Sequence, residues 1–480
     1  MGLILLVVVV TFVGGVARRA DLPAPLLLVA AGVAGSYLPR YGTVEVDPEL
    51  VLVGLIPPLL YAAATQTSLL EFRSNLRNIA SLSVGLVIAT TVAVGVFAWW
   101  VLPIPLAAGL AIGAVVAPPD AVAATAIARR VGLPRRLVGL LEGESLVNDA
   151  TALVCLTAAI GALEGHVSAV GIGWEFVVSV VGGTAVGVAV AVVVAKIRMH
   201  VDDTITHTAL SLLTPFVAYL AAEEIHASGV LALVIAGLVL GHKSALLQSA
   251  ASRLFERSNW ATVAFVLEGS VFVLIGLQVR PIIRAMQHSD LGGGRIALAA
   301  AGALLVVVVV RFAWVMTDLA GYRRRARRDP ALATVPWGRG VVLSWAGMRG
   351  VVTLAAAFVL PEDTPHREVL LFIALVVAAG TLLLQGATLP AVIRRAGLPA
   401  PDRHEDALLA AEIVQRASVQ GLARLDELAA EDDGLAPTIV ERLRERSTER
   451  ADARWERLGG GAETPSEIYA RLRQEMLEAE

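Results

Sequence analysis

The chain has 480 residues, of which 56% are hydrophobic and 17% are charged, and its mean hydropathy of +0.71 excludes a water-soluble protein of this length. Most of the chain is therefore expected to lie in lipid. Its net charge of −3, with the acidic residues gathered near the carboxyl end, implies no nucleic-acid partner, and its single cysteine, Cys155, excludes an intrachain disulfide.

Long apolar runs follow one another from residue 1 to residue 398. A membrane-spanning helix needs about 20 mostly apolar residues, and Pro, Gly and charged residues mark the limits of the runs. The sequence therefore predicts an all-α polytopic membrane protein with about thirteen spans. We place them at residues 2–17, 24–38, 49–64, 79–100, 105–128, 137–163, 169–195, 206–222, 228–242, 259–279, 294–319, 338–360 and 367–393.

The basic residues predict the topology, because cytoplasmic loops carry an excess of Lys and Arg. Basic loops alternate with acidic or nearly neutral ones, except that residues 280–295 are basic on the wrong side. With an odd number of spans, this pattern places the amino terminus outside and the carboxyl terminus in the cytoplasm, across a plasma membrane of the bacterial type. The basic loops are residues 18–19, 73–77, 129–136, 196–198, 243–257 and 323–328.

After Pro401 the sequence becomes charged and Ala-rich, with helical spacing. We predict amphipathic helices at residues 404–428 and 437–458, a turn at 432–434 between them, and a third helix capped by Thr464. Residues 399–480 are thus expected to form a helical cytoplasmic tail behind a transmembrane domain of residues 1–398. We interpret the tail as a solvated helical appendage, with a ligand-sensing regulatory domain as the alternative.

Two predicted spans contain helix-breaking residues. Pro118 and Pro119 remove backbone donors, which lipid forbids unless the freed groups face protein or a water-filled cavity. Asp120 follows them, where the start of a new half-helix offers unpaired N–H groups to a carboxylate. In the second span, Gly347 and Gly350 bracket Arg349. Two broken spans in separate halves of a chain indicate an inverted-repeat transporter with its site at the bilayer midplane.

Ionisable residues within spans are the strongest pointers to function, because each costs about 2.5–3.5 kcal/mol at mid-span. Glu144 and Asn148 are four residues apart, as are Ser145 and Asp149, so the polar residues share one broad helix face. Hydrogen bonds between helices, at about 0.6 kcal/mol each, would explain Ser145 and Asn148 but need no carboxylate. The candidates are Asp120, Glu144, Asp149, Glu268, Arg311 and Arg349, with Glu142 nearer a helix end.

Several motifs together resemble the monovalent cation:proton antiporter family, in the branch of the NhaP-like bacterial and animal sodium/proton exchangers. They are PPLLYAAATQTS at residues 57–68, APPDAV at 117–122, GESLVNDATALV at 143–154, EGSVFVLIG at 268–276, Arg311 in its span, and GMRG at 347–350. The resemblance covers the membrane part of the chain and excludes the tail. It implies a homodimer in the membrane that exchanges H+ for a monovalent cation, most directly Na+, without a cofactor.

The resemblance also implies roles for individual residues. Asp149 would bind Na+ and the proton in turn, and Ser145 would supply a further oxygen. Asn148 would brace the crossing of the broken helices. The cation- and proton-binding set is completed by Pro119, which stands where relatives often carry threonine. The remaining implied roles are a buried pair of Glu144 with Arg311, compensation of the half-helix dipoles by Asp120 and Arg349, and pathway positions at Glu268 and Tyr61, the latter where some relatives carry an acid.

The residues support a mechanism without the resemblance. Na+ needs hard oxygen ligands and a nearby negative charge, so it competes with a proton for Asp149. Exchange follows if the protein changes its exposure only when Asp149 has bound one of them. The alternatives from other classes are a membrane-embedded enzyme, which would need a base beside Ser145, and a cation channel, which would favour a continuous polar pore. The eight histidines lie in loops or at span ends, which argues against the enzyme.

Overall fold

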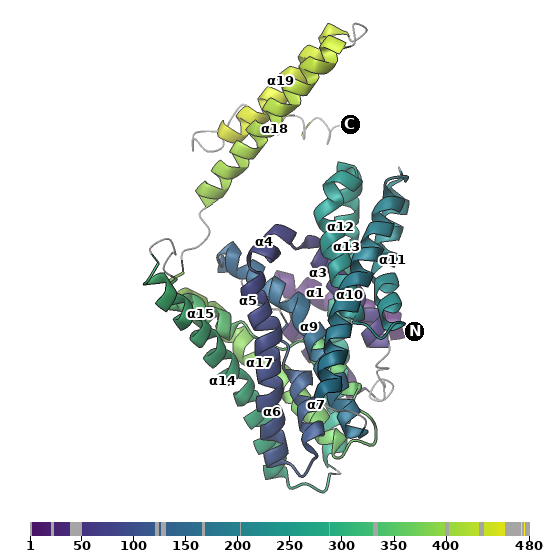
Figure 1. Ribbon diagram of the computed structural model, residues 1–480, viewed down its shortest axis with the longest axis vertical. Helices are drawn as coiled ribbons and strands as arrows, with labels where there is room; N and C mark the ends of the chain where they lie inside the picture. Colours follow the sequence, from purple (N-terminus) through teal and green to yellow (C-terminus); the bar gives the residue numbers. More distant parts are fainter. Residues whose placement is uncertain are drawn as a thin grey trace. The chain divides into compact units, whose positions relative to one another are not determined.

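The computed structural model divides the chain into two compact units, Met1–Leu398 and Pro399–Glu480. The structure describes residues 2–20, 24–38, 50–120, 124–125, 131–165, 169–201, 203–287, 289–329, 335–398, 403–431 and 436–456, together with residues 472 and 475. These parts of the chain are helical apart from turns and short linkers, and they contain no β-strand (Figure 1).

The first unit is a bundle of helices joined mostly by short connections. Its elements are α1 (Gly2–Arg19), α2 (Ala24–Ser36), the π-helical turn η1 (Leu50–Leu55), α3 (Ile56–Gln66), α4 (Leu69–Ser74), α5 (Leu76–Ala80), the π-helical turn η2 (Ser81–Leu86), α6 (Val87–Val101), α7 (Leu106–Val116), α9 (Arg135–Leu163), α10 (Ala169–Arg198), α11 (Thr204–Glu223), α12 (Gly229–Leu247), α13 (Ala250–Gln287), α14 (Gly293–Ala326), α15 (Trp337–Trp345), α16 (Val351–Phe358) and α17 (Arg367–Arg395).

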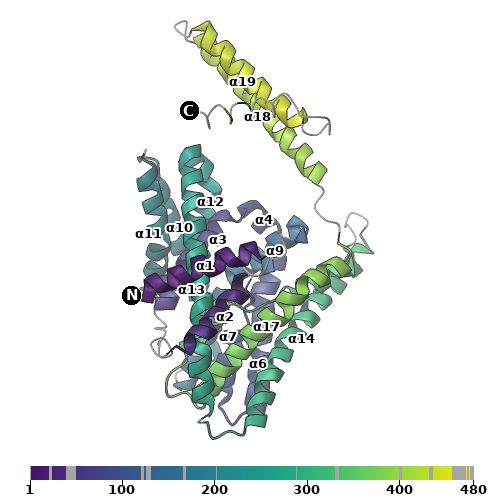
Figure 2. The same ribbon diagram turned by 180° about the vertical axis from the view of Figure 1, so that it is seen from behind.

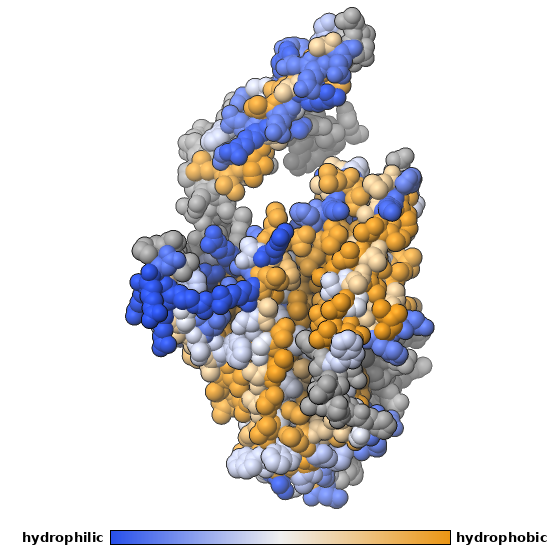
Figure 3. All heavy atoms as spheres, viewed as in Figure 1, coloured by the Kyte–Doolittle hydropathy of each residue, from blue (hydrophilic) through white to orange (hydrophobic). Residues whose placement is uncertain are grey.

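Eight helices in the described part of this unit are long and apolar enough to cross a membrane. Large apolar side chains such as Phe12 and Trp100 are more than 70% exposed on its surface, as lipid contact requires. Figure 3 shows apolar residues over the sides of the helices and charged residues at their ends. The prediction of a helical, polytopic membrane protein is therefore confirmed.

The interior consists mainly of two apolar clusters. The larger one gathers side chains from α6, α7, α9 and α13 to α17. The second gathers side chains from α3, α10, α11 and α12, together with Trp260 of α13 and Leu146 and Ala150 of α9. Because α9 contributes to both clusters, the polar residues on this helix lie where the clusters meet.

The helix α13 is longer than predicted. We expected a span at residues 259–279 after a basic loop at 243–257, but α13 has 38 residues, from Ala250 to Gln287, and continues through Pro281. Most of the predicted loop is helical, since α12 ends only at Leu247. Charged residues mark where an apolar span leaves lipid, and a helix with satisfied backbone bonds does not have to end there.

Both predicted helix breaks are present. The helix α7 ends at Val116, and residues 117–120 are not helical. The helix α15 ends at Trp345, residues 346–350 are not helical, and α16 begins at Val351. The rest of the first broken span falls on residues outside the described part, apart from Ala124 and Thr125, which are helical.

The second unit is an antiparallel pair of helices, α18 (Arg403–Glu431) and α19 (Pro437–Glu456), close to the two predicted ones. Trp455 Nε1 donates to Gln415 Oε1 at 2.7 Å, and Arg444 pairs with Asp426 at 2.7 Å. The end of α19 thus contacts the middle of α18, and the end of α18 contacts the middle of α19, so the two helices run in opposite directions. The predicted turn at 432–434 and the predicted start of a third helix at Thr464 lie outside the described residues.

The helices α2 and α13 cross at two glycines, on the side of the unit seen in Figure 2. A Cβ on Gly276 would overlap the backbone at Val29 and Gly32, and a Cβ on Gly32 would overlap the backbone of α13. The close packing of this helix pair therefore depends on the two missing side chains.

We expect Gly276→Ala to separate the two helices, since overpacking a tight contact costs about 1–3 kcal/mol. The measurement is the thermal unfolding temperature of the purified protein in detergent. Gly15→Ala is the control, because a Cβ at that position would meet no atom within 4 Å beyond the backbone of its own helix and its chain neighbours. Equal unfolding temperatures for the two variants would contradict this account of the crossing.

Candidate functional site

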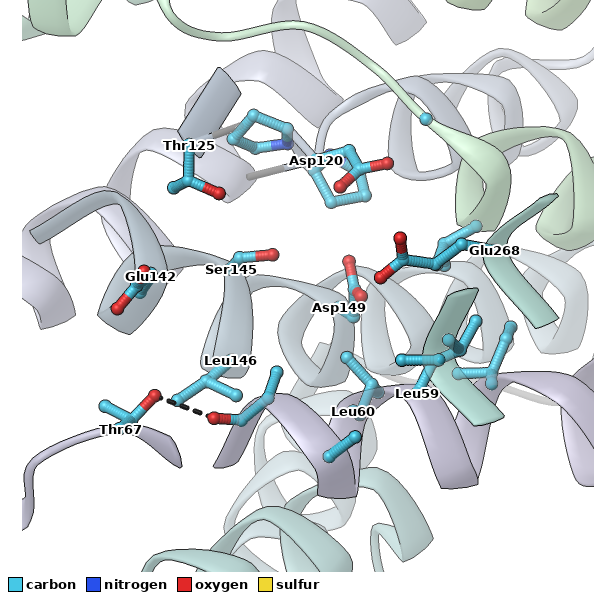
Figure 4. A pocket seen from close by; sticks show the side chains of 18 of the residues that line it. Leu59, Leu60, Thr67, Asp120, Thr125, Glu142, Ser145, Leu146, Asp149 and Glu268 are labelled. Atoms are coloured by element: carbon cyan, nitrogen blue, oxygen red, sulfur yellow. Dashed lines mark hydrogen bonds between the residues drawn. The ribbon is translucent and has the colours of Figure 1, made fainter. Parts of the chain in front are cut away.

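A cavity of about 230 Å³ lies between α3, α9, α13, α16 and the unwound residues after α7. Asp149 of α9 is one of its lining residues and is only 5% exposed. Figure 4 shows the carboxylates of Asp149, Asp120 and Glu268 facing a common space, with Ser145 beside them. The structure thus brings together four of the predicted site residues, although they come from three separate parts of the sequence.

The charge of this cavity favours cations. Four carboxylates line it, those of Asp120, Glu142, Asp149 and Glu268, and no Lys or Arg is among its described lining residues. Low-dielectric walls strengthen the repulsion between like charges and raise the local concentration of counter-ions. A cation or a proton that enters the cavity relieves this repulsion.

One face of α9 contributes a row of oxygen-bearing side chains to the cavity wall. Glu142, Ser145 and Asp149 are spaced three and four residues apart, so they lie on one helix face, and all three line the cavity (Figure 4). The sequence predicts that Ser145 acts with Asp149 and places Glu142 nearer a helix end. The spacing of Glu142 from Ser145 is the signal that could have included it.

Four further polar residues of the lining were missed. Two are Thr125 and Thr353, and the other two are Gln66 and Thr67 at the end of α3. Gln66 and Thr67 both belong to the quoted segment PPLLYAAATQTS, but only Tyr61 was given a role there. The side chain of Thr67 donates to the carbonyl of Ala63 at 2.9 Å, as drawn in Figure 4. Since that hydroxyl satisfies its own helix end, the sequence alone gave no reason to place it at a cavity.

The two unwound segments are hydrogen-bonded to each other beside this cavity. The backbone N–H of Asp120 donates to the carbonyl of Met348 at 2.7 Å. Asn148 Nδ2 donates to the carbonyl of Pro119 at 2.7 Å, and Asn148 is fully buried. Pro119 lines the cavity whereas Asn148 is not among its lining residues. Asn148 therefore holds the backbone of the first break, and its place among the cation ligands stays a prediction.

Arg349 satisfies the end of α7. Its Nε donates to the carbonyl of Val116 at 3.0 Å, its Nη2 to that of Ala117 at 3.1 Å, and its Nη1 to that of Gly347. The last carbonyls of a helix lack intrahelical partners and carry the negative end of its dipole, so a buried guanidinium stabilises them in both respects. The Arg349 N–H in turn donates to Thr381 Oγ1 of α17 at 2.9 Å.

The carboxylate of Asp120 lies at the second break, beside the residue that precedes α16. Gly350 immediately precedes α16, and a Cβ on Gly350 would overlap the carboxylate of Asp120. The negative charge therefore lies beside the amino-terminal end of α16, where the helix dipole favours an anion. A glycine is required at this position because the carboxylate occupies the space of a side chain.

Glu144 and Arg311 form a buried, two-pronged ion pair. Arg311 Nη1 lies 2.5 Å from Glu144 Oε1, and Nη2 lies 2.9 Å from Oε2. Neither side chain is more than 1% exposed. Arg311 also donates to the carbonyl of Leu343 near the end of α15. A Cβ on Gly347 would overlap the Arg311 side chain, which explains the other glycine of GMRG.

Tyr61 is a predicted pathway residue that the structure does not bring to this cavity. It is fully buried, is not among the lining residues of the cavity, and packs against Trp260 with ring centroids 5.3 Å apart. It lines a second cavity on the other side of α3. A phenol at this position faces away from the carboxylates, so the position adds no ligand to them here.

Residues 4–395 match the transmembrane sodium/hydrogen exchanger family. The chain belongs to that family. It is 38% identical over 468 residues to an uncharacterised Na+/H+ exchanger of Mycobacterium tuberculosis, an alignment that covers 94% of this chain and 83% of the relative. It is 33% identical over 388 residues to a sodium, potassium, lithium and rubidium/H+ antiporter of Bacillus subtilis, covering 77% of this chain and 57% of that protein.

The fold of this exchanger family member is similar to that of a solved relative. The sodium proton antiporter MjNhaP1 from Methanocaldococcus jannaschii superposes with a TM-score of 0.65 at 17% sequence identity, covering 82% of this chain and 98% of that one. At this identity the likeness concerns the fold alone.

In this exchanger, we expect Arg311→Ala and Glu144→Ala each to lower the free energy of unfolding by about 3–5 kcal/mol, because each leaves a buried charge without its partner. The measurement is expression and thermal stability of each variant, with Arg324→Ala, an exposed arginine near the end of α14, as the control. The exchanged pair, Glu144→Arg with Arg311→Glu, should recover part of the loss. Stable single variants would contradict a structural role for the pair.

Proposed function

We propose that this chain is a secondary active antiporter that exchanges a monovalent cation, Na+ in the first instance, for H+ across the plasma membrane. The observation that carries the proposal is the buried carboxylate of Asp149, which faces a cavity lined by three further carboxylates and no described basic residue. Such a site attracts both metal cations and protons. Membership of the sodium/hydrogen exchanger family favours Na+ and H+ as the two ions.

Asp149 is the group for which the two ions compete. Na+ takes oxygen ligands, and the row on α9 offers the Asp149 carboxylate with the Ser145 hydroxyl one turn away. Glu268 and Asp120 face the same space and contribute negative charge. A proton on Asp149 removes the charge that holds the cation, so the site holds one ion or the other.

Coupling follows if the change of exposure requires Asp149 to be neutralised. An empty, charged site buried in the membrane carries a large desolvation cost, whereas a carboxylate with Na+ or H+ bound does not. Each change of exposure then moves one ion in one direction. Glu144 takes no part in this exchange, since Arg311 already neutralises it.

The architecture that we propose for this function has about thirteen spans, arranged as inverted repeats with two interrupted helices that cross. Support comes from eight long apolar helices among the described residues, the two breaks, and the likeness to MjNhaP1. Residues 1–398 would be the antiporter domain and residues 399–480 a cytoplasmic helical tail, with the amino terminus outside and two chains forming a homodimer.

The other two classes of function gain no support. The relatives compared above are named as exchangers or antiporters, and none is named as an enzyme or a channel. The Bacillus subtilis relative is named for four alkali cations, which makes the choice of ion the first quantity to measure.

We expect Asp149→Asn to abolish exchange while the protein still folds, because the amide keeps the shape of the carboxylate and lacks its charge. The measurement is dequenching of a pH-sensitive dye in proteoliposomes when Na+, K+, Li+ or Rb+ is added. Asp318→Asn is the matched control, the same chemical change at an exposed position on α14 that does not line the cavity. Cation-driven proton flux in Asp149→Asn at the wild-type rate would overturn the proposal.

We expect Glu142→Gln to raise the half-saturating cation concentration about two- to fivefold at low ionic strength, because Glu142 adds negative charge to the cavity without holding the ion. The maximal rate should be unchanged, and the difference from wild type should shrink at high salt, where exposed charges are screened. The readout is the same flux assay at two concentrations of choline chloride. A lower maximal rate with unchanged half-saturation would show that Glu142 acts differently.

A further inference from the structure

A second cavity of about 310 Å³ lies on the far side of α3, between α3, α10, α12 and α13. Its lining carries three arginines, Arg198, Arg253 and Arg257, and one acid, Glu256. We refer to it as the basic cavity. Its described lining has a formal charge of +2, from three positive groups and one negative group, in contrast to the four carboxylates and no described basic residue on the other side of α3.

Arg198 is the most deeply buried of these charges, with 2% of its side chain exposed. Its Nη2 lies 3.4 Å from Glu256 Oε1, and its Nε has no hydrogen-bond partner among the described residues. An unpaired buried N–H of a guanidinium is costly. An oxyanion in the cavity would supply the missing acceptor.

Glu256 does not supply that acceptor, because its oxygens are held in place by other donors and bond Arg198 only through Nη2. Ser211 Oγ donates to Glu256 Oε1 at 2.5 Å, and Gln248 Nε2 donates to Oε2 at 2.5 Å. Trp260 Nε1 donates to Ser211 Oγ at 2.9 Å and holds that hydroxyl in place. The acid is thus part of a closed network, and the excess positive charge of the cavity is left without a described counter-charge.

The arrangement suits an anion with several oxygens better than a single-atom ion. The cavity is large, and Arg253 Nη1 holds the carbonyl of Gln248 at 2.9 Å, which ties the turn between α12 and α13 to the cavity wall. Ser244 and Thr65 add hydroxyl groups to the lining. Planar guanidinium groups with nearby hydroxyls match the geometry of phosphate oxygens.

The helix α3 separates this cavity from the carboxylate cavity. Ala62 and Ala63 line the carboxylate cavity, Tyr61 and Thr65 line the basic cavity, and Gln66 lines both. A ligand that fixes α3 from one side therefore changes the wall of the site on the other side. Two sites that share a wall in this way influence each other's affinity reciprocally.

We propose that the basic cavity binds a phosphate-bearing anion, either free in solution or as a lipid headgroup, and that its occupancy changes the affinity of the cation site across α3. Binding itself is independent of the proposed antiport. The effect on cation affinity rests on the proposed antiport, so phosphate binding and its coupling to the cation site are tested separately.

The binding test uses the full chain purified in an uncharged detergent. Its thermal unfolding temperature is measured in N-methylglucamine phosphate and in N-methylglucamine chloride at the same ionic strength and pH. A second arm adds phosphatidylglycerol or phosphatidylcholine to the micelles. A saturable rise with phosphate identifies a soluble anion, and a rise with phosphatidylglycerol alone identifies a lipid headgroup.

Arg257→Gln is the test variant, because Arg257 is exposed and lines the cavity, whereas replacing Arg198 would leave Glu256 without its arginine. We expect it to raise the half-saturating concentration of whichever probe binds by about threefold. Arg324→Gln, an exposed arginine that does not line the cavity, should bind like wild type. Equal responses of wild type and Arg257→Gln to both probes, or no response to either, would overturn the proposal.

Asp149→Asn keeps the binding test separate from transport. This variant should still give a saturable rise with the probe that binds, because Asp149 does not line the basic cavity. The coupling test then compares the half-saturating Na+ concentration of the wild-type protein in proteoliposomes with and without the probe that binds. An unchanged value would overturn the coupling while leaving the binding site in place.

Discussion

Backbone groups inside a lipid bilayer must find hydrogen-bond partners within the protein, because each unpaired group costs several kcal/mol. Two spans of this chain are interrupted, and much of the site follows from how their freed backbone groups find partners. Arg349 donates hydrogen bonds to the carbonyls at the end of α7, and the carboxylate of Asp120 lies beside the start of α16. The Asp120 and Met348 backbones bond to each other, and Asn148 holds the carbonyl of Pro119. The irregular backbone is thereby rigid enough to hold a carboxylate cavity beside it.

The buried charges divide into two kinds by their partners. Glu144 has an arginine that occupies both of its oxygens, so its charge is permanently compensated. Asp149, only four residues from Ser145 on the same helix, faces other carboxylates across a cavity that an ion can enter. The helix α9 therefore places an acid with a fixed arginine partner and an acid that faces the cavity about 1.4 turns apart. The surroundings of each acid depend on the residues of the neighbouring helices rather than on the acid itself.

Sequence patterns predicted the membrane class, the two breaks and the two tail helices, because hydropathy, paired prolines and helical spacing act locally. The pairing of Glu144 with Arg311, which are 167 residues apart, came only from family resemblance. The predicted length of α13 was too short, because charged residues were taken as the limit of a helix. For the same reason Arg198 and Glu256 were assigned to loops, although they meet in a buried network. The position of Tyr61 depends on the rotation of α3, which no sequence pattern specifies.

The central claim is that one carboxylate, Asp149, holds either a cation or a proton and never both. The most direct measurement is the half-saturating Na+ concentration for exchange in proteoliposomes as a function of pH, at constant ionic strength. The account predicts that this concentration rises as the pH falls, approaching about tenfold per pH unit at the acidic end, while the maximal rate at saturating Na+ is preserved. A half-saturating concentration that does not change with pH would contradict the account, since the two ions would then occupy separate sites.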